Sequence, residues 1–204
     1  MPQILKHRFS LTPSAMLWTV SAFLAITGNI QFFQQTSAVY SFAEYWPFLI
    51  SQGVLLLCAI MLMATVLGFF LPTRIVAAIL LLTGSVAGYF SDTLGIAIDK
   101  EMIRNVFVTT TDEALDLLNW GLVLRVGLLG ILPTIAVFLI PLKPSKILIR
   151  QGKLAGTAVL SLLVAALSIA PFGDSYASLF REHKPLRYFT NPAHPIYSAV
   201  NLAV

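Results

Sequence analysis

Five long apolar runs, separated by shorter polar segments, set the pattern of this 204-residue chain. At about 1.5 Å of rise per residue, a helix of roughly 20 residues crosses a hydrocarbon core of about 30 Å. We therefore interpret each run as a membrane-spanning helix and expect an all-α membrane protein with five transmembrane helices plus short interfacial helices. The predicted spans cover residues 14–33, 47–71, 75–90, 121–142 and 154–172.

Three of these runs carry features that bear on processing or packing. The first run ends in Asn29 and Gln31 rather than in the small residues of a signal-peptide cleavage site, so we expect an uncleaved anchor. In the third run, Gly84 and Gly88 have the spacing that lets two helices approach closely. In the fourth run, Pro133 predicts a kink, which neighbouring helices tolerate.

Two polar segments, residues 92–119 and 174–204, lie outside the predicted spans. The second cannot cross the membrane again, because prolines interrupt it and no apolar run within it is long enough. We expect a short helix over residues 175–183. The predicted domains are a five-span transmembrane domain, residues 1–173, and an interfacial linker, residues 174–204. The ending NLAV suggests a cut inside a longer protein.

The composition excludes an ordinary soluble domain. Hydrophobic residues make up 57% of the chain, charged residues 11%, and the mean hydropathy is +0.84, whereas charged residues form about a quarter of a soluble domain. The formal charge of +4 does not indicate nucleic-acid binding, because much of the basic charge lies at the ends of apolar runs. The single cysteine, Cys58, lies inside an apolar run, which excludes a disulfide framework and predicts a packing role.

The basic residues of the loops predict the orientation of the chain. Seven lie on the N-terminal side of the predicted membrane and five on the other, and the first outer loop, residues 34–46, has none. Short cytoplasmic loops carry the excess of Lys and Arg, so we expect a cytoplasmic N-terminus. The seven are Lys6, Arg8, Arg74, Lys143, Lys146, Arg150 and Lys153, and the five are Lys100, Arg104, Arg181, Lys184 and Arg187.

Most of the polar chemistry gathers in residues 98–116, IDKEMIRNVFVTTTDEALD. Asn105, Thr109 and Glu113 recur there every four residues, which on a continuous helix places an amide, a hydroxyl and a carboxylate along one face. Such a row suits a polar head group. Two other interpretations remain open. Thr110 and Glu113 have the spacing of a helix-capping box, and the β-branched residues around Thr109 favour a break in the helix.

Arg125 is the one ionisable residue placed within a predicted span. Two interpretations remain open for it: the long side chain extends to the nearby head groups, or its guanidinium meets a lipid phosphate. The three histidines, His7, His183 and His194, are scattered without the spacing of metal ligands, so we expect no metal site in this chain.

Two segments of the chain resemble a known family. The run YFSDTLGIAIDKEMIRNVFVTTTDEALDLL, residues 89–118, is similar to the first large periplasmic segment of the lipid A phosphoethanolamine transferases, which include the mobile colistin-resistance enzymes. The run REHKPLRYFTNPAHPIYS, residues 181–198, resembles the passage from membrane domain to catalytic domain in that family. With the five spans, the resemblance covers essentially the whole chain.

The resemblance implies a bacterial inner-membrane enzyme that moves phosphoethanolamine from phosphatidylethanolamine to lipid A and so confers polymyxin resistance. It implies that residues 92–119 and 174–204 are periplasmic, and that zinc and a threonine nucleophile belong to a C-terminal periplasmic catalytic domain absent from this chain. We therefore expect the chain alone to be inactive. The family's substrate-binding Asn, Thr and Glu match Asn105, Thr109 and Glu113, with Arg125 as a possible further contact.

Two other functional classes remain as alternatives. One is a non-catalytic lipid-binding or assembly protein of the membrane, and the less favoured one is a small transporter subunit. A transporter is expected to show internal repeats or broken helices with polar groups at mid-membrane. Apart from Pro133, the predicted spans show neither feature.

Overall fold

The structure of the protein is a computed structural model that describes residues 10–108 and 118–203. In these two ranges every regular element is a helix, and an isolated parallel bridge joins Leu11 to Leu142. The predicted all-α class is therefore confirmed. In chain order the elements are α1 (Pro13–Thr27), α2 (Ile30–Val39), α3 (Phe42–Phe70), α4 (Thr73–Leu94), α5 (Lys100–Val108), α7 (Trp120–Arg125), the π-helix η1 (Val126–Ile131), α8 (Leu132–Leu139), α9 (Ile147–Ile169), the 3₁₀ helix η2 (Ala170–Phe172), α10 (Gly173–Glu182), the 3₁₀ helix η3 (Lys184–Phe189) and α11 (Ala193–Ala203).

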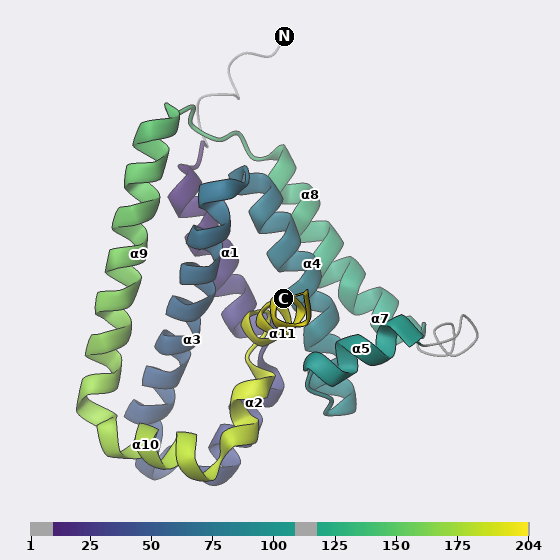
Figure 1. The fold of residues 1–204 in the computed structure, drawn as a ribbon, viewed down its shortest axis with the longest axis vertical. Coiled ribbons are helices and arrows are strands. Elements are labelled where there is room, and N and C mark those ends of the chain that lie inside the picture. Colours follow the sequence, from purple (N-terminus) through teal and green to yellow (C-terminus); the bar gives the residue numbers. More distant parts are fainter. Residues whose placement is uncertain (1–9, 109–117, 204) are drawn as a thin grey trace.

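The long helices form a bundle with two distinct ends (Figure 1). Across the bundle, α9 packs on α3, α3 on α1, α1 on α4, and α4 on η1 and α8. The start of α1, the turn between α3 and α4 and the connection from α8 to α9 lie at one end, which we call the N-terminal end. Helices α2, α5 and α10 lie toward the other end, which we call the α10 end, and α11 lies nearer the middle of the bundle (Figure 1).

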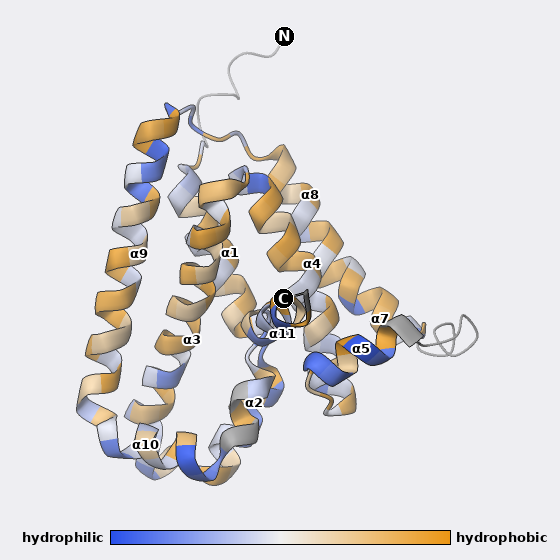
Figure 2. Ribbon diagram, viewed as in Figure 1, coloured by the Kyte–Doolittle hydropathy of each residue, from blue (hydrophilic) through white to orange (hydrophobic). Residues whose placement is uncertain are grey.

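The bundle has the dimensions and surface of a membrane domain. Among the described residues, four helical stretches are long and apolar enough to cross a membrane, and α1 with α2 passes the same test as a pair bent by 55°. The outward face of α9 is apolar, with Leu160, Leu163 and Leu167 exposed by 50%, 58% and 72% (Figure 2). Exposing an apolar face of this kind to water costs free energy, whereas contact with lipid chains does not.

The first span is broken, and the sequence-based expectation of one continuous run over residues 14–33 missed the break. Helix α1 starts at a cap, where the backbone N–H of Ala15 donates to Thr12 Oγ1 at 3.2 Å. It ends at Gly28, beyond which the Asn29 amide donates to the carbonyl oxygen of Leu24 at 2.9 Å. Asn and Gly disfavour a helix interior, because Asn binds nearby backbone groups and Gly adds backbone freedom.

The second and third spans are longer than the predicted 47–71 and 75–90 at three of their four ends. Helix α3 begins at Phe42, ahead of Pro47, and contains a kink at Tyr45, where the backbone departs from helical angles (φ −114°, ψ 19°). Helix α4 ends at Gly95, whose φ of 66° lies in the left-handed region, and the Gly95 N–H donates to the Ser91 carbonyl oxygen at 3.1 Å. That conformation favours glycine.

The close approach predicted from Gly84 and Gly88 is confirmed. A Cβ atom added to Gly84 of α4 would lie 2.6 Å from Leu24 of α1, and one added to Gly88 would lie 3.2 Å from the Gly28 carbonyl oxygen. The two glycines therefore allow α4 to pack closely against α1 and the break that follows it.

The fourth span contains a π-helical turn where the sequence predicted a simple kink at Pro133. Proline has no N–H to donate to the carbonyl four residues before it. In the π-helix η1, just ahead of Pro133, the bonding shifts by one residue, and the Leu132 N–H donates to the Gly127 carbonyl oxygen. The wider turn brings Gly130 against Ser85 of α4, where any side chain at position 130 would collide.

The fifth span begins earlier than the predicted residue 154. Helix α9 starts at Ile147, and Arg150 in its first turn donates to the Gly68 carbonyl oxygen at 3.2 Å. Arg150 therefore binds a free carbonyl group near the C-terminal end of α3, while Lys143 and Lys146 lie in the connection before α9. The short helix predicted over residues 175–183 is confirmed as α10 (Gly173–Glu182).

Two apolar clusters hold these helices together. The larger joins α1, α3 and α4, where Leu17, Ile60 and Leu80 are fully buried. The smaller lies under α10, and its buried members are Phe48, Tyr176, Leu179 and Leu186. The second cluster attaches residues 174–203, which we call the tail, to α3. Cys58 is free and 1% exposed, in agreement with a packing role.

Candidate functional site

The structure describes one member of the predicted polar row. Asn105 lies on α5 and is exposed, whereas Thr109 and Glu113 lie outside the described residues. Helix α5 starts after Asp99, whose Oδ1 accepts a hydrogen bond from the Met102 N–H at 2.8 Å and so satisfies a backbone donor of the first turn. The row itself stays a prediction.

The tail holds the start of α5 in place. His194 Nδ1 of α11 lies 3.2 Å from the carbonyl oxygen of Ile98, and Lys100 Nζ donates to the Asn201 carbonyl oxygen at 3.4 Å. Helices α5 and α11 also pack against each other. The position of Asn105 relative to the bundle therefore depends on the tail as well as on α4.

Arg125, the last residue of α7, is held inside the protein. Its guanidinium donates to the carboxylate of Asp92 and, at 3.1 Å, to the carbonyl oxygen of Thr27. The side chains of Arg125 and Asp92 are 15% and 5% exposed. The structure gives Arg125 an internal partner that neither interpretation of the sequence included, and ionisable residues at membrane depth commonly pair with one another in this way.

Asp92 also binds the start of α2. Its other carboxylate oxygen, Oδ1, accepts a hydrogen bond from the Gln31 N–H at 2.8 Å. A carboxylate at a helix N-terminus satisfies a backbone donor and interacts favourably with the helix dipole. Asp92 therefore joins the end of α4 to both α2 and α7.

Two asparagines from opposite ends of the chain form a reciprocal pair. The Asn191 N–H donates to Asn29 Oδ1 at 2.7 Å, and Asn29 Nδ2 donates to the Asn191 carbonyl oxygen at 2.9 Å. Asn191 Nδ2 also donates to the Gly28 carbonyl oxygen and to Ser91 Oγ, both at 3.1 Å. Both asparagines are fully buried. The peptide bond between Asn191 and Pro192 is cis.

Together these contacts form what we call the break network, which consists of Asn29, Asp92, Arg125 and Asn191 around the break between α1 and α2. At the break, Arg125 and Asn191 bind the carbonyl oxygens of Thr27 and Gly28, and Asn29 adds a second hydrogen bond to the Leu24 carbonyl oxygen, which also accepts from the Gly28 N–H. Backbone groups buried at membrane depth need such partners. The network positions α4, α7 and the tail around one point.

An open depression lies beside the junction of α5 and the tail. It measures about 400 Å³ and is lined by Tyr188, Thr190, Ala193, His194 and Tyr197. The His194 ring lies 5.0 Å from the Tyr188 ring and 6.4 Å from the Tyr197 ring, between ring centroids. In the part of the chain that the structure describes, no group of three His, Cys, Asp or Glu side chains is arranged to hold a metal ion.

Sequence reasoning missed the break network for two different reasons. Asp92 and Arg125 have opposite charges and lie toward the same end of consecutive spans, a signal from which the pair could have been predicted. Asn29 and Asn191 are separated by 162 positions, and nothing in the sequence pairs them.

Residues 55–204 match the model of a family described as phosphoethanolamine transferase EptA/EptB. The phosphatidylethanolamine transferase Mcr-2 of Escherichia coli is 36% identical over 97% of the chain, and the phosphoethanolamine transferase EptA of Salmonella typhimurium is 32% identical over 91%. The chain spans about a third of the length of these curated relatives, 37% and 34%.

A solved structure has the same fold. It is the integral membrane protein lipooligosaccharide phosphoethanolamine transferase A (EptA) from Neisseria meningitidis, which matches 94% of this chain with a TM-score of 0.86 and 24% sequence identity. The match covers 36% of that protein. The likeness shows that the helices described above are arranged as in a known integral membrane protein.

Proposed function

Because the chain belongs to the phosphoethanolamine transferase EptA/EptB family, we propose that it is the membrane domain of an enzyme that moves phosphoethanolamine from phosphatidylethanolamine to lipid A. The observation that carries the proposal is the family match over residues 55–204, which includes α5 and the whole tail. The added ammonium group offsets the negative charge of lipid A phosphate, which weakens the binding of cationic polymyxins.

The enzyme lies in the bacterial inner membrane, with its N-terminus in the cytoplasm and the α10 end of the bundle at the periplasmic face. The distribution of charge supports this orientation. Arg74, Lys143 and Arg150 line one depression at the N-terminal end, whereas Asp92 and Asp99 lie at and just beyond the end of α4. An excess of Lys and Arg in short loops marks the cytoplasmic side.

Asn105, Thr109 and Glu113 bind the head group of the donor lipid. The Glu113 carboxylate pairs with the ethanolamine ammonium, while Asn105 and Thr109 donate hydrogen bonds to the phosphate. The exposure of Asn105 on α5 supports this assignment. Arg125 acts as a positioning residue instead of a phosphate ligand, because its guanidinium is engaged by Asp92 and Thr27.

The reacting groups belong to a catalytic domain outside residues 1–204. The resemblance implies a zinc ion and a threonine nucleophile there, and the greater length of the relatives leaves room for such a domain. Zinc would stabilise the negative charge that develops during phosphoryl transfer. The membrane domain contributes the donor-lipid part of the site and carries the catalytic domain through its tail.

The test uses the intact enzyme in a polymyxin-sensitive bacterium that lacks its own transferases, with lipid A analysed by mass spectrometry. We expect the wild type to add phosphoethanolamine to lipid A. Glu113→Ala should reduce the modified fraction about ten- to a hundredfold at an unchanged protein level, because one charge-assisted contact with the head group is lost.

The matched control is Glu101→Ala, which removes an exposed carboxylate of α5 that pairs with Arg104. It should leave the modified fraction unchanged. Unmodified lipid A with the wild type would contradict the proposed transfer. Equal losses in the two variants, or a loss of protein that parallels the loss of activity, would contradict the role of Glu113.

A further inference from the structure

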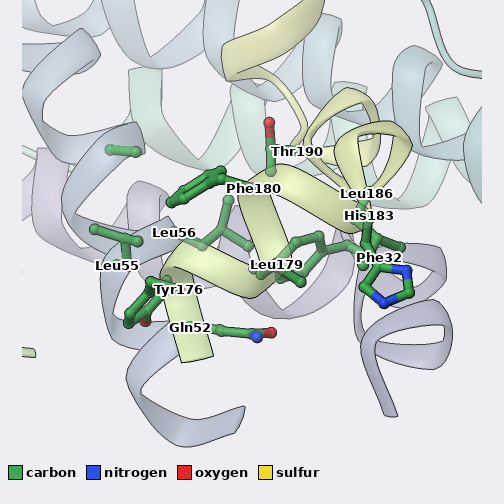
Figure 3. Close-up of a pocket in the computed structure, with 11 residues that line it drawn as sticks. Phe32, Gln52, Leu55, Leu56, Tyr176, Leu179, Phe180, His183, Leu186 and Thr190 are labelled. Carbon is green, nitrogen blue, oxygen red and sulfur yellow. The ribbon is translucent and has the colours of Figure 1, made fainter. Parts of the chain in front are cut away.

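A cavity of about 160 Å³ lies at the α10 end, between α3 and the tail (Figure 3). Most of its lining is apolar and includes Phe32, Leu56 and Leu179. An engineered cavity of about 150 Å³ with similar walls holds a benzene molecule. The cavity is therefore large enough for part of one hydrocarbon chain with a small group attached.

Gln52 of α3 places a polar group without a partner in this apolar wall (Figure 3). The side chain is 3% exposed, and both Nε2 and Oε1 are buried without a hydrogen-bond partner among the described residues. The Tyr176 hydroxyl, also in the lining, is engaged by Ser51 Oγ at 2.8 Å. Buried amides are normally satisfied, so the orphaned donor and acceptor point to a missing ligand.

The chemistry of the cavity restricts that ligand. An amide offers a donor at Nε2 and an acceptor at Oε1, so an ester or ether oxygen, which accepts only, would leave Oε1 unsatisfied. A hydroxyl group accepts from Nε2 and donates to Oε1. The other polar side chains of the lining are His183 and Thr190, and it contains no Lys or Arg side chain that would favour an anionic head group. The ligand is therefore a neutral lipid with a free hydroxyl group next to hydrocarbon.

We propose that the cavity binds diacylglycerol, with the glycerol hydroxyl on the Gln52 amide and the adjoining chain against the apolar walls. The choice of this lipid rests on the proposed function. Transfer breaks the bond between phosphorus and the glycerol oxygen of phosphatidylethanolamine, and that oxygen takes up a proton. The acceptor oxygen forms the new bond to phosphorus and gives up a proton. The remaining lipid is a diacylglycerol with one free hydroxyl.

The position of the cavity agrees with this occupant. The cavity lies at the α10 end of the bundle, as does α5 with Asn105 (Figure 1). Phe180, one of the lining residues, is 51% exposed, so the cavity adjoins the surface of the protein. A diacylglycerol is larger than the cavity, and the rest of its chains would extend past this rim into the bilayer.

The test titrates the intact enzyme in nanodiscs with dioctanoylglycerol and with its 3-O-methyl ether, and native mass spectrometry reports the bound lipid. The ether keeps the chains and the acceptor oxygen but has no donor. The wild type should bind the hydroxyl lipid about five- to tenfold more tightly than the ether, the effect of one hydrogen bond in a dry site. Gln52→Leu should abolish that preference.

Gln151→Leu is the matched control, because it makes the same change at the N-terminal end, where the Gln151 amide donates to the Phe69 carbonyl oxygen at 3.2 Å. It should keep the preference. Absence of bound diacylglycerol, equal affinity for the two lipids, or a preference that survives in Gln52→Leu would overturn the proposal. Phosphoethanolamine transfer is measured on the same preparation. If transfer is intact, any of these binding results overturns only the proposed diacylglycerol site. If transfer is absent, the proposed function itself is contradicted.

Discussion

The ion pair between Arg125 and Asp92 is buried, and each partner depends on the other. Removing one partner of such a pair leaves an uncompensated charge, which commonly destabilises a protein by about 3–5 kcal/mol. The chain also contains an exposed pair, Arg104 with Glu101, whose side chains are 55% and 66% exposed. Pairs of that kind contribute only about 0–1 kcal/mol. The same substitution at Arg125 and at Arg104 removes one positive charge in each case, so a difference between their effects on stability reports the burial of the pair.

We predict that Arg125→Gln lowers the free energy of unfolding by about 3–5 kcal/mol, because the buried Asp92 side chain loses its partner. Arg104→Gln should change it by less than about 1 kcal/mol. Unfolding of the purified protein in detergent, followed by circular dichroism, measures both. The double variant Arg125→Gln with Asp92→Asn should regain part of the loss, and equal effects of the two arginine substitutions would show that the buried pair is not structural.

At the scale of elements, the packing of α4 on α1 depends on Gly88, whereas Gly156 of α9 has open space around it. A Cβ at position 88 would lie 3.2 Å from the carbonyl oxygen of Gly28. That oxygen is a backbone atom held by Asn191, so it cannot readily move away. A Cβ at position 156 would meet nothing within 4 Å. The same Gly→Ala substitution should therefore lower the stability of the protein in α4 and raise it in α9.

Gly88→Ala should destabilise the protein by about 1–3 kcal/mol through overpacking, and Gly156→Ala should stabilise it by about 0.5–1 kcal/mol through helix propensity. In a chain of this size 1 kcal/mol shifts the unfolding temperature by roughly 2–4 °C. Thermal unfolding in detergent gives both shifts. A rise in the unfolding temperature of Gly88→Ala would mean that α1 and α4 are further apart than described.

The limits of the elements show what a pattern of apolar residues can predict. The runs predicted the existence and the order of the spans, because each must supply enough apolar surface to cross the bilayer. Their ends were less predictable, since a helix continues into polar sequence wherever its backbone groups find partners. Arg150 is an example: it lies in the first turn of α9, and its side chain binds the Gly68 carbonyl oxygen of α3, 82 positions away.

At the scale of the whole molecule, the break network joins the first span to the tail. Asn29 and Asn191 pair across 162 positions, and α11 in turn holds α5. The tail therefore packs directly against the helices of the bundle. For the candidate site, the spacing of Asn105, Thr109 and Glu113 and the family resemblance predicted a row of head-group ligands. Neither of them could predict that Arg125 pairs with another part of the chain.

We propose that residues 1–204 form the membrane domain of a transferase and supply only part of its site. The most direct test reconstitutes the intact enzyme, and separately residues 1–204, into vesicles that contain lipid A and phosphatidylethanolamine labelled in its ethanolamine group. We predict that label appears on lipid A with the intact enzyme and not with residues 1–204 alone. Label transferred by residues 1–204 alone, or no transfer by the intact enzyme, would contradict this assignment.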